Sequence, residues 1–231
     1  GAAAVLLAGG NFPRRAMEPL GNMYTELYKE KQTANAFIIS DKTAESLMGS
    51  GWNELKEQGK KAAVKSSSNK ARIELAFGKK VQFLQSSNVL GIIEGTDKKE
   101  EWLVITAHYD HLGTGKPVNG DSIFNGANDD ASGTTAVIAL AGQFARVKKK
   151  PERTLLFVGF TAEESGGYGA TYFSLQLNPE KVVAMFNIEM IGTESKWGKN
   201  SAYITGFERT DFGPMLQENL KGSAFTFHPD P

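Results

Sequence analysis

Four short polar segments carry the residue types that metal-assisted hydrolysis uses. They offer an imidazole together with several carboxylates, a mixed nitrogen and oxygen ligand set that suits Zn²⁺. The four segments are AHYDHLG (107–113), NGANDDASG (125–133), TAEESGG (161–167) and NIEMIG (187–192).

The first segment places a histidine directly after an apolar run. Asp110 follows His108 by two residues. A carboxylate there can accept a hydrogen bond from the imidazole nitrogen that is not on a metal, which fixes the ligand tautomer. Taken alone, the pair fits a hydrogen-bonded core histidine and a turn-forming aspartate better.

The next two segments each hold adjacent carboxylates. Asp129 and Asp130 precede a helix and, by themselves, fit a turn with a helix cap, although two adjacent aspartates repel unless a cation or solvent screens them. Glu163 and Glu164 follow an apolar strand. One of them could bind metal while the other, with a raised pKa, takes a proton from bound water. A solvated acidic turn fits this pair equally well.

Glu189 lies among Phe186, Ile188, Met190 and Ile191. Burial of an unpaired ionised carboxylate is expensive, so we expect a cationic partner for Glu189. Because no lysine or arginine lies within five residues on either side, a metal ion or a remote base is favoured.

Composition excludes several other classes of function. Lys plus Arg and Asp plus Glu are 26 each, so the formal net charge is zero and no basic field favours nucleic acid. No apolar run reaches the length of about 18 residues that a membrane-spanning helix needs. The chain has no cysteine, which excludes a thiol nucleophile, and it has neither a GxSxG elbow nor a GxxxxGK[ST] phosphate loop.

The elements that must position these segments form an α/β pattern after Glu101. Apolar strands alternate with amphipathic helices, which predicts a parallel sheet with crossover helices. The polar segments follow strand ends or begin helices, where open α/β sheets place ligand sites. We expect strands over 103–106, 155–160, 182–188 and 202–205, and helices over 133–148 with Ser132 as N-cap, 168–177 and 211–220.

The sequence predicts that residues 1–85 form a separate, smaller, β-rich domain. Residues 86–231 are expected to form the domain that carries the polar segments. The boundary lies just before the expected strand 86–95. Within the smaller domain we expect a buried strand over 1–10, strands over 36–41 and 70–77, and a helix over 43–48 capped by Asp41 or Thr43.

The four motifs, in this order, resemble the di-zinc aminopeptidases, family twenty-eight of the metallopeptidases, which includes leucine aminopeptidase-like enzymes. The resemblance covers roughly residues 86–192. It implies a mixed, mostly parallel central sheet flanked by helices, as in the phosphorylase and zinc-exopeptidase folds, with a smaller insert or cap domain.

By this resemblance, His108 and Glu189 bind the first zinc, Asp129 bridges two zinc ions and Glu164 binds the second. Asp110 orients His108, and Glu163 is the general base. The Asp129–Asp130 peptide is cis in such enzymes. The implied reaction is hydrolysis of a peptide bond by a hydroxide that bridges two metals about 3.5–4 Å apart.

The sequence departs from the family at two positions. Glu189 stands where the family usually has Asp. The family's last ligand, a histidine of the second zinc, lies well downstream, so His228 is not assigned, and His111 is not a usual ligand. We therefore expect the catalytic domain to be truncated at its C-terminus, with that histidine beyond Pro231.

The remaining expectations also follow from resemblance. The segments GAAAVL and IISDKTAESLM resemble the latter part of a protease-associated domain, which would cap the cleft. The implied function is a zinc-dependent exopeptidase that acts on peptide substrates in an extracellular or periplasmic location. A glutaminyl cyclase-like single-zinc transferase and a metal-free receptor or binding homologue are the alternatives.

Overall fold

The computed structural model describes residues 4–8, 35–61, 68, 70–77 and 83–230. The chain divides into two compact units, Gly1–Phe83 and Leu84–Pro231, because residues contact one another mainly within each unit. The sequence places the division two residues later, before Ser86. Each unit is described by itself.

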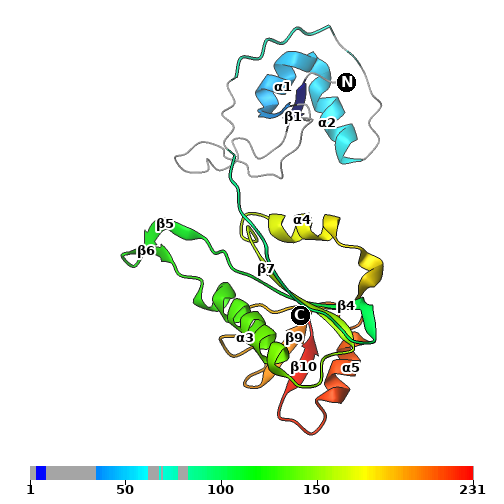
Figure 1. Cartoon of the computed structure of the whole chain (residues 1–231). Coiled ribbons are helices and arrows are strands. Elements are labelled where there is room, and N and C mark those ends of the chain that lie inside the picture. The colour runs from blue at the N-terminus through cyan, green and yellow to red at the C-terminus, as the bar shows by residue number, and fades with distance from the viewer. Residues whose placement is uncertain (1–3, 9–34, 62–67, 69, 78–82, 231) are drawn as a thin grey trace. The chain divides into compact units, whose positions relative to one another are not determined.

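The described part of the first unit combines two strands with two helices (Figure 1). Strands β1 (Ala4–Ala8) and β2 (Asn35–Ile39) pair in parallel. Helices α1 (Asp41–Met48) and α2 (Trp52–Lys60) follow, joined by a 3-10 turn. This part of the unit is therefore more helical than the β-rich domain that we expected.

Three local expectations for this unit need correction. The N-cap of α1 is Ser40, whose backbone is extended and whose Oγ accepts a hydrogen bond from the Thr43 N–H at 3.1 Å. Strand β1 is not buried, since Leu7 is 52% exposed; Gly9 and Gly10 lie outside the described residues. Residues 70–77 form no strand, because they pair with no other strand in the described part of the chain.

The second unit is built on a four-stranded mixed sheet with the order β3-β7-β4-β8. Strand β3 runs antiparallel to β7, whereas β7, β4 and β8 are parallel. This confirms the expected mixed, mostly parallel sheet. The four strands are β3 (Val89–Ile93), β4 (Lys98–His108), β7 (Arg153–Phe160) and β8 (Val182–Asn187).

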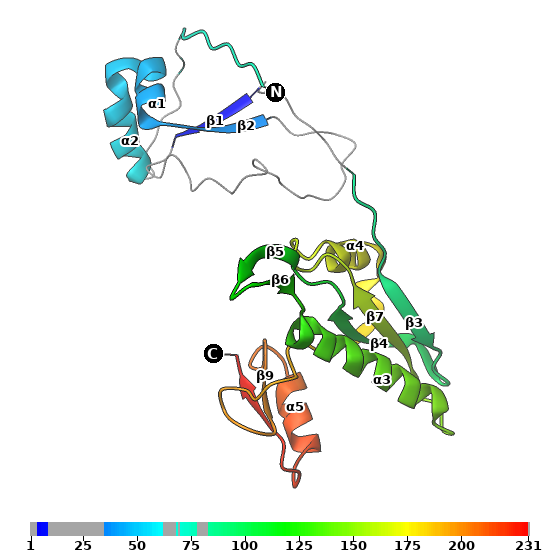
Figure 2. The ribbon, with the colours of Figure 1, turned by 90° about the vertical axis from the view of Figure 1, so that its left-hand side faces the viewer.

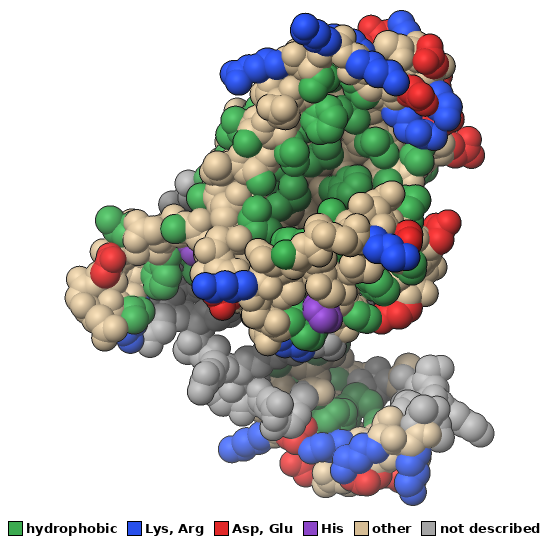
Figure 3. Space-filling model, turned by 90° about the horizontal axis from the view of Figure 1, so that it is seen from below, with side chains coloured by type: hydrophobic (Ala, Val, Ile, Leu, Met, Phe, Trp, Pro, Cys, Tyr) green, Lys and Arg blue, Asp and Glu red, His purple; other side chains and the backbone are tan. Residues whose placement is uncertain are grey.

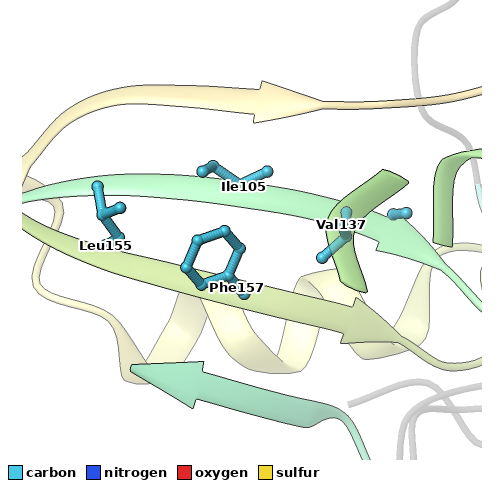
Figure 4. Packing of buried hydrophobic residues seen from close by; sticks show 5 residues of the cluster. Ile105, Val137, Leu155 and Phe157 are labelled. Atoms are coloured by element: carbon cyan, nitrogen blue, oxygen red, sulfur yellow. The ribbon is translucent and has the colours of Figure 1, made fainter. Parts of the chain in front are cut away.

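Helices cover both faces of this sheet (Figure 2). On one face, Val137 of α3 (Ser132–Arg146) packs on Ile105 and Phe157 of the central strands (Figure 4). On the other face, Phe173 of α4 (Tyr168–Gln176) packs on the cluster of Val104, Leu156, Val158 and Phe160. Burial on two sides explains why β7 and the second half of β4 are apolar at nearly every position.

Strand β8 is at the edge of the sheet and alternates between more and less exposed side chains. Val183 and Met185 point to the exposed side. Figure 3 shows a broad area of apolar side chains on one face of the molecule, with charged side chains at its rim. The alternation in β8 therefore reflects burial on one side only.

The second unit also contains elements outside the four-stranded sheet and its two helices. The sequence expectations do not include the hairpin of β5 (Gly113–Val118) and β6 (Asp121–Phe124), nor β10 (Thr226–Pro229), which pairs in parallel with β9 (Ser201–Ile204). Helix α5 (Phe212–Asn219) connects β9 to β10.

The predicted helices and the strands β7, β8 and β9 have ends within two residues of those expected, whereas β4 begins five residues earlier. Among the described residues, no helix combines the length and apolar character required to cross a membrane.

Candidate metal centre

Three parallel strands end at the same edge of the sheet and carry most of the predicted site residues. His108 is the last residue of β4, Glu163 and Glu164 follow β7, and Glu189 follows β8. Asp129 enters the same cluster from an irregular helical turn that leads into α3. The expected convergence of these segments is therefore present in the structure.

The side chains form two ligand-like groups that share one aspartate. The first group contains His108, Asp129 and Glu189, and the second contains His111, Asp129 and Glu164. Within each group, one nitrogen or oxygen atom per residue lies within 4.8 Å of the others. Each group thus offers one imidazole and two carboxylates, a donor set that fits Zn²⁺.

Four atoms at the centre of these groups are buried without a hydrogen-bond partner: His108 Nε2, Asp129 Oδ1, His111 Nδ1 and Glu164 Oε1. His108 Nε2 is 3.1 Å from Asp129 Oδ1, and His111 Nδ1 is 2.7 Å from Glu164 Oε1, yet neither pair is aligned for a hydrogen bond. Buried polar atoms normally have partners. Cations between these atoms would satisfy all four, so the residues present fit a metal centre.

The tautomer of His108 is set by its neighbour. The His108 ring is buried, with 2% of its side chain exposed, and Nδ1 is 2.9 Å from the Asp110 carbonyl oxygen. A carbonyl only accepts hydrogen bonds, so Nδ1 carries the proton and the lone pair of Nε2 is free for a metal. Burial lowers the pKa of His108, but the Asp110 carbonyl and the carboxylates of Asp130, Glu163 and Asp110 outweigh it and raise the pKa overall.

The carboxylate of Asp110 has a different role from the one expected. Its Oδ1 is 3.7 Å from His108 Nδ1, and it accepts hydrogen bonds from the main-chain N–H groups of Glu163 (3.0 Å) and Glu164 (3.2 Å). The main chain of Asp110 orients the histidine, and its side chain holds the turn after β7. The role of Asp110 in the site stays a prediction; in this structure its carbonyl oxygen, at 2.9 Å, lies nearer to His108 Nδ1 than its carboxylate does.

Asp130 belongs to neither group and is 1% exposed. It accepts hydrogen bonds from the N–H groups of Gly133 (3.1 Å) and Met190 (3.2 Å), and burial is the main cause of its raised pKa. The peptide between Asp129 and Asp130 is cis, as the resemblance implies. Asp130 therefore connects the turn before α3 to the segment after β8.

Two more side chains of this turn hold the same segment. Asn128 Oδ1 accepts a hydrogen bond from Gly192 N–H at 2.8 Å, and Ser132 Oγ accepts one from Ile191 N–H at 3.1 Å. Together with the hydrogen bond from Met190 N–H to Asp130, these contacts mean that three successive main-chain N–H groups after Glu189 donate to side chains of one turn. The sequence expectations assign no such role to Asn128, and Ser132 was expected only as a helix cap.

Glu189 is exposed, which corrects the expectation of a buried carboxylate. Partial desolvation raises its pKa, while the neighbouring His108 lowers it. The Asn187 amide donates a hydrogen bond to Glu189 Oε2 at 3.3 Å. Glu189 therefore reaches the first group from the rim of the site.

Glu163 belongs to neither ligand-like group. Its side chain is 46% exposed and its Oε2 lies 4.0 Å from His108 Nε2. The carbonyl of Glu163 accepts hydrogen bonds from the N–H groups of Gly166 and Gly167, both at 2.8 Å, which closes a tight turn. A carboxylate beside the ligand atoms and open to solvent has the placement that proton transfer to or from water requires.

His111 is the one residue in the groups that the sequence interpretation left out. The available signal was its position in the same polar segment as His108, three residues further on. Nothing in the sequence indicated the direction of its ring.

A mixed α/β sheet with histidines and carboxylates at its strand ends is the architecture of a metallohydrolase. The family model described as Peptidase family M28 matches residues 88–229, more than half of the chain. The chain therefore belongs to peptidase family M28, a family of zinc metallopeptidases, which confirms the family resemblance.

Two curated relatives have related names. A probable zinc metalloprotease of Leptosphaeria maculans is 35% identical over 111 residues, which are 47% of this chain and 25% of that protein. A vacuolar membrane protease of Saccharomyces cerevisiae is 38% identical over 148 residues, which are 63% of this chain and 13% of that protein. The chain thus spans a quarter or less of the length of these relatives.

Among solved structures, the LapA aminopeptidase of Legionella pneumophila is similar, with a TM-score of 0.49 and 23% identity over 62% of this chain and 36% of that chain.

The expected extracellular or periplasmic location is wrong, because the yeast relative is named for the vacuolar membrane and no comparison indicates secretion. The likeness of the first unit to a protease-associated domain stays a prediction.

Proposed function

We propose that the chain is a zinc-dependent exopeptidase that removes N-terminal residues from peptides, with one zinc ion at each of the two ligand-like groups. The observation that carries this proposal is the sharing of Asp129 by both groups beside the solvent-exposed carboxylate of Glu163. The family supplies the metal and the reaction class, and the geometry suggests which residues would do the work.

In this proposal, His108, Asp129 and Glu189 hold the first ion, and Asp129 and Glu164 contribute to the second. Bound zinc supplies a Lewis acid that polarises the scissile carbonyl and lowers the pKa of water to about 7. The unpartnered Nε2 of His108 and Oδ1 of Asp129 support this assignment, because both atoms are buried and available.

Glu163 acts as the general base. It takes a proton from the attacking water and passes it to the amine of the leaving peptide. Its exposure supports this role, since water and substrate must reach its carboxylate, whereas the ligand atoms of Asp129 and Glu164 are buried. Asp110 keeps the backbone of Glu163 in place during proton transfer.

The exopeptidase part of the proposal comes from the resemblance to aminopeptidases. A free amino terminus distinguishes such a substrate from the interior of a peptide. The test therefore compares two peptides of the same sequence, one with a free N-terminus and one N-acetylated, incubated with the zinc-loaded chain.

We expect the free peptide to lose its first residue and the acetylated peptide to stay intact. Glu163→Gln should lower kcat by about 10²–10⁴-fold, the usual contribution of a positioned base, with zinc content unchanged. Glu218→Gln, on the exposed side of α5, is the matched control and should keep full activity.

Cleavage of both peptides at internal bonds would show an endopeptidase instead. Ammonia release from a peptide with N-terminal Gln, without cleavage, would favour cyclisation by a single-zinc enzyme. A chain that binds no zinc would contradict the proposal altogether.

A further inference from the structure

We infer that Asn88 is a positioning residue for Glu163, and that it acts by fixing the chain segment on which Glu163 lies. This inference rests on the proposed function, in which Glu163 is the general base. Asn88 directly precedes β3 and belongs to neither ligand-like group. The expectations from sequence assign no role to Asn88.

The first argument is that the amide of Asn88 binds both ends of the segment between β7 and α4. Its Oδ1 accepts a hydrogen bond from Thr161 N–H at 3.2 Å, and its Nδ2 donates one to the Gly169 carbonyl at 2.8 Å. Thr161 is the first residue after β7, and Gly169 is the second residue of α4. One side chain thus connects the two ends of the segment that carries Glu163.

The second argument is the close packing at Gly169. This glycine is buried, and its N–H donates a hydrogen bond to the Thr161 carbonyl at 3.0 Å. A Cβ on Gly169 would lie 2.3 Å from the Thr161 carbonyl oxygen and 2.5 Å from Asn88 Oδ1. Only a residue without a side chain allows this approach, so the contact with Asn88 is part of the packing of the segment.

The third argument is the backbone between the two ends. Ala162 adopts a left-handed conformation with φ of 55°, which is uncommon for a residue with a Cβ and persists only where the surroundings impose it. Asn88 binds the N–H of Thr161, directly before Ala162. Asp110 binds the N–H of Glu163, directly after it. The unusual residue therefore has one side-chain anchor on each side.

Loss of the Asn88 amide removes the anchor in front of Ala162 and lets this residue return to a common backbone conformation. The distance of Glu163 Oε2 from His108 Nε2, 4.0 Å in the structure, is then no longer fixed. Because a misplacement of about 1 Å can lower a rate by about 10²-fold, we expect kcat to fall. The first ligand-like group contains no residue of this segment, so the first zinc should bind as before.

Asn178 provides a matched control. Its Oδ1 also accepts a hydrogen bond from a main-chain N–H, that of Glu180 at 3.1 Å. The contact lies at the start of the 3-10 turn before β8, and Asn178 is in neither ligand-like group. Removal of this amide therefore costs the same kind of hydrogen bond without affecting the segment after β7.

The experiment is a double-mutant cycle on the zinc-loaded chain, with a peptide that has a free N-terminus as substrate. Asn88→Ala should lower kcat by about 10–100-fold in the wild-type background, with a much smaller change in KM. In the Glu163→Gln background, the same substitution should change kcat by less than about 2-fold, because a base that has been removed cannot be misplaced. Asn178→Ala should keep the wild-type kcat.

Equal losses of kcat in the two backgrounds, or no loss in the wild-type background, would overturn the inference and leave the proposed function standing. A Glu163→Gln variant with wild-type kcat would overturn the proposed function and the inference together. If Asn88→Ala does not fold, Asn88→Asp enters the same cycle, since it keeps the acceptor for Thr161 N–H and loses the donor to Gly169. We expect a loss of about 10-fold for Asn88→Asp in the wild-type background alone.

A second readout does not depend on activity. In the metal-free chain, hydrogen exchange at the amides of Thr161 and Glu163 should be at least about 10-fold faster in Asn88→Ala than in the wild type, because the segment opens locally more often. Asn178→Ala should leave both exchange rates unchanged. Faster exchange at Thr161 alone would show that the lost contact does not reach Glu163, and would contradict the positioning role.

Discussion

The carboxylate of Asp110 accepts a hydrogen bond from the main-chain N–H of Glu163 at 3.0 Å. The same carboxylate accepts the N–H of Glu164 at 3.2 Å, while the carbonyl of Asp110 accepts from His108. One residue after β4 therefore positions both the ring at the end of that strand and the turn after β7. Loss of its side chain should disturb the turn and leave the ring in place.

We expect Asp110→Ala to lower kcat/KM by about 10–100-fold, the range typical for residues that orient ligands, because Glu163 and Glu164 lose their anchor. Peptide hydrolysis and zinc binding are the measurements. Asp121→Ala is a suitable control, since Asp121 also binds a main-chain N–H, that of Ile123 at 2.8 Å, but does so in the hairpin. Equal activity of the two variants would contradict this role of Asp110.

The segment after Glu189 should depend on the turn before α3. Ser132→Ala removes the acceptor for Ile191 N–H, so we expect the first zinc to bind about 10-fold more weakly as Glu189 loses its fixed position. Thr135→Ala is the control, because its hydroxyl donates to the carbonyl of Ala131, the residue before α3, and not to this segment. Calorimetric zinc titration compares the two, and equal affinities would exclude the effect.

Substitution by alanine should change the free energy of unfolding in opposite directions at two glycines of α3. A Cβ on Gly133 would lie 2.1 Å from Ile188 O and 2.5 Å from Asp130 Oδ1, so Gly133→Ala should lower the free energy of unfolding by about 2 kcal/mol or more. A Cβ on Gly142 meets no atom within 4 Å, so Gly142→Ala should raise it by about 0.5–1 kcal/mol through helix propensity. Urea denaturation measures both, and the same sign for both would be inconsistent with the packing described.

The metal-free chain should lose stability as the pH rises. The pKa of His108 is raised in the folded state, so its proton stabilises the fold fully below the ordinary value of 6.5, and this contribution is lost as the pH passes the folded pKa. The pKa values of Asp130 and Glu189 are also raised, above their ordinary values of 3.8 and 4.5. Their protons therefore stabilise the fold at low pH, and this contribution is also lost as the pH rises. We therefore expect a lower Tm at about pH 8 than at about pH 6 in the presence of a chelator.

Zinc should reverse this trend, because its ligands bind in their deprotonated forms. His108→Gln should flatten the pH dependence of the metal-free chain, and His228→Gln should preserve it. Thermal unfolding monitored by circular dichroism provides the Tm values. A metal-free Tm that increases toward pH 8 would show that another group dominates.

The sheet and the location of the site could be predicted from sequence for one physical reason. The buried strands β4 and β7 are apolar runs, and the carboxyl ends of parallel strands meet at one edge. His108, Glu163 and Glu189 follow directly from that rule. The position of Asp129 depends on where helix α3 begins, and the neighbouring Asn, Asp and Ser residues also indicate that helix start.

Other features depend on contacts that no local pattern encodes. Whether the carbonyl or the carboxylate of Asp110 meets His108 is decided by the path of the chain after β4. The ring direction of His111 depends on Gly126, fifteen residues away in sequence and in contact only in the fold. The alternation of residues 70–77 predicted a strand, but a strand forms only where a partner strand is available.

One missed element did have a local signal. Asn119 and Gly120, with φ of 54° and 87°, form the turn of the β5–β6 hairpin. An Asn-Gly pair is the commonest sequence for such a two-residue turn. The flanking GTGKPV is weakly β-forming, and that composition hid the hairpin.

The last strand of the four-stranded sheet has a consequence for biosynthesis. Thr106 of β4 donates a hydrogen bond to Asn187 of β8, 81 positions later, and Glu189 reaches the cluster only when these strands have paired. While the polypeptide leaves the ribosome, the cluster stays incomplete until β8 has emerged and docked. The candidate metal centre is thus assembled late in the synthesis of this unit, after the strand that precedes Glu189 has been added to the sheet.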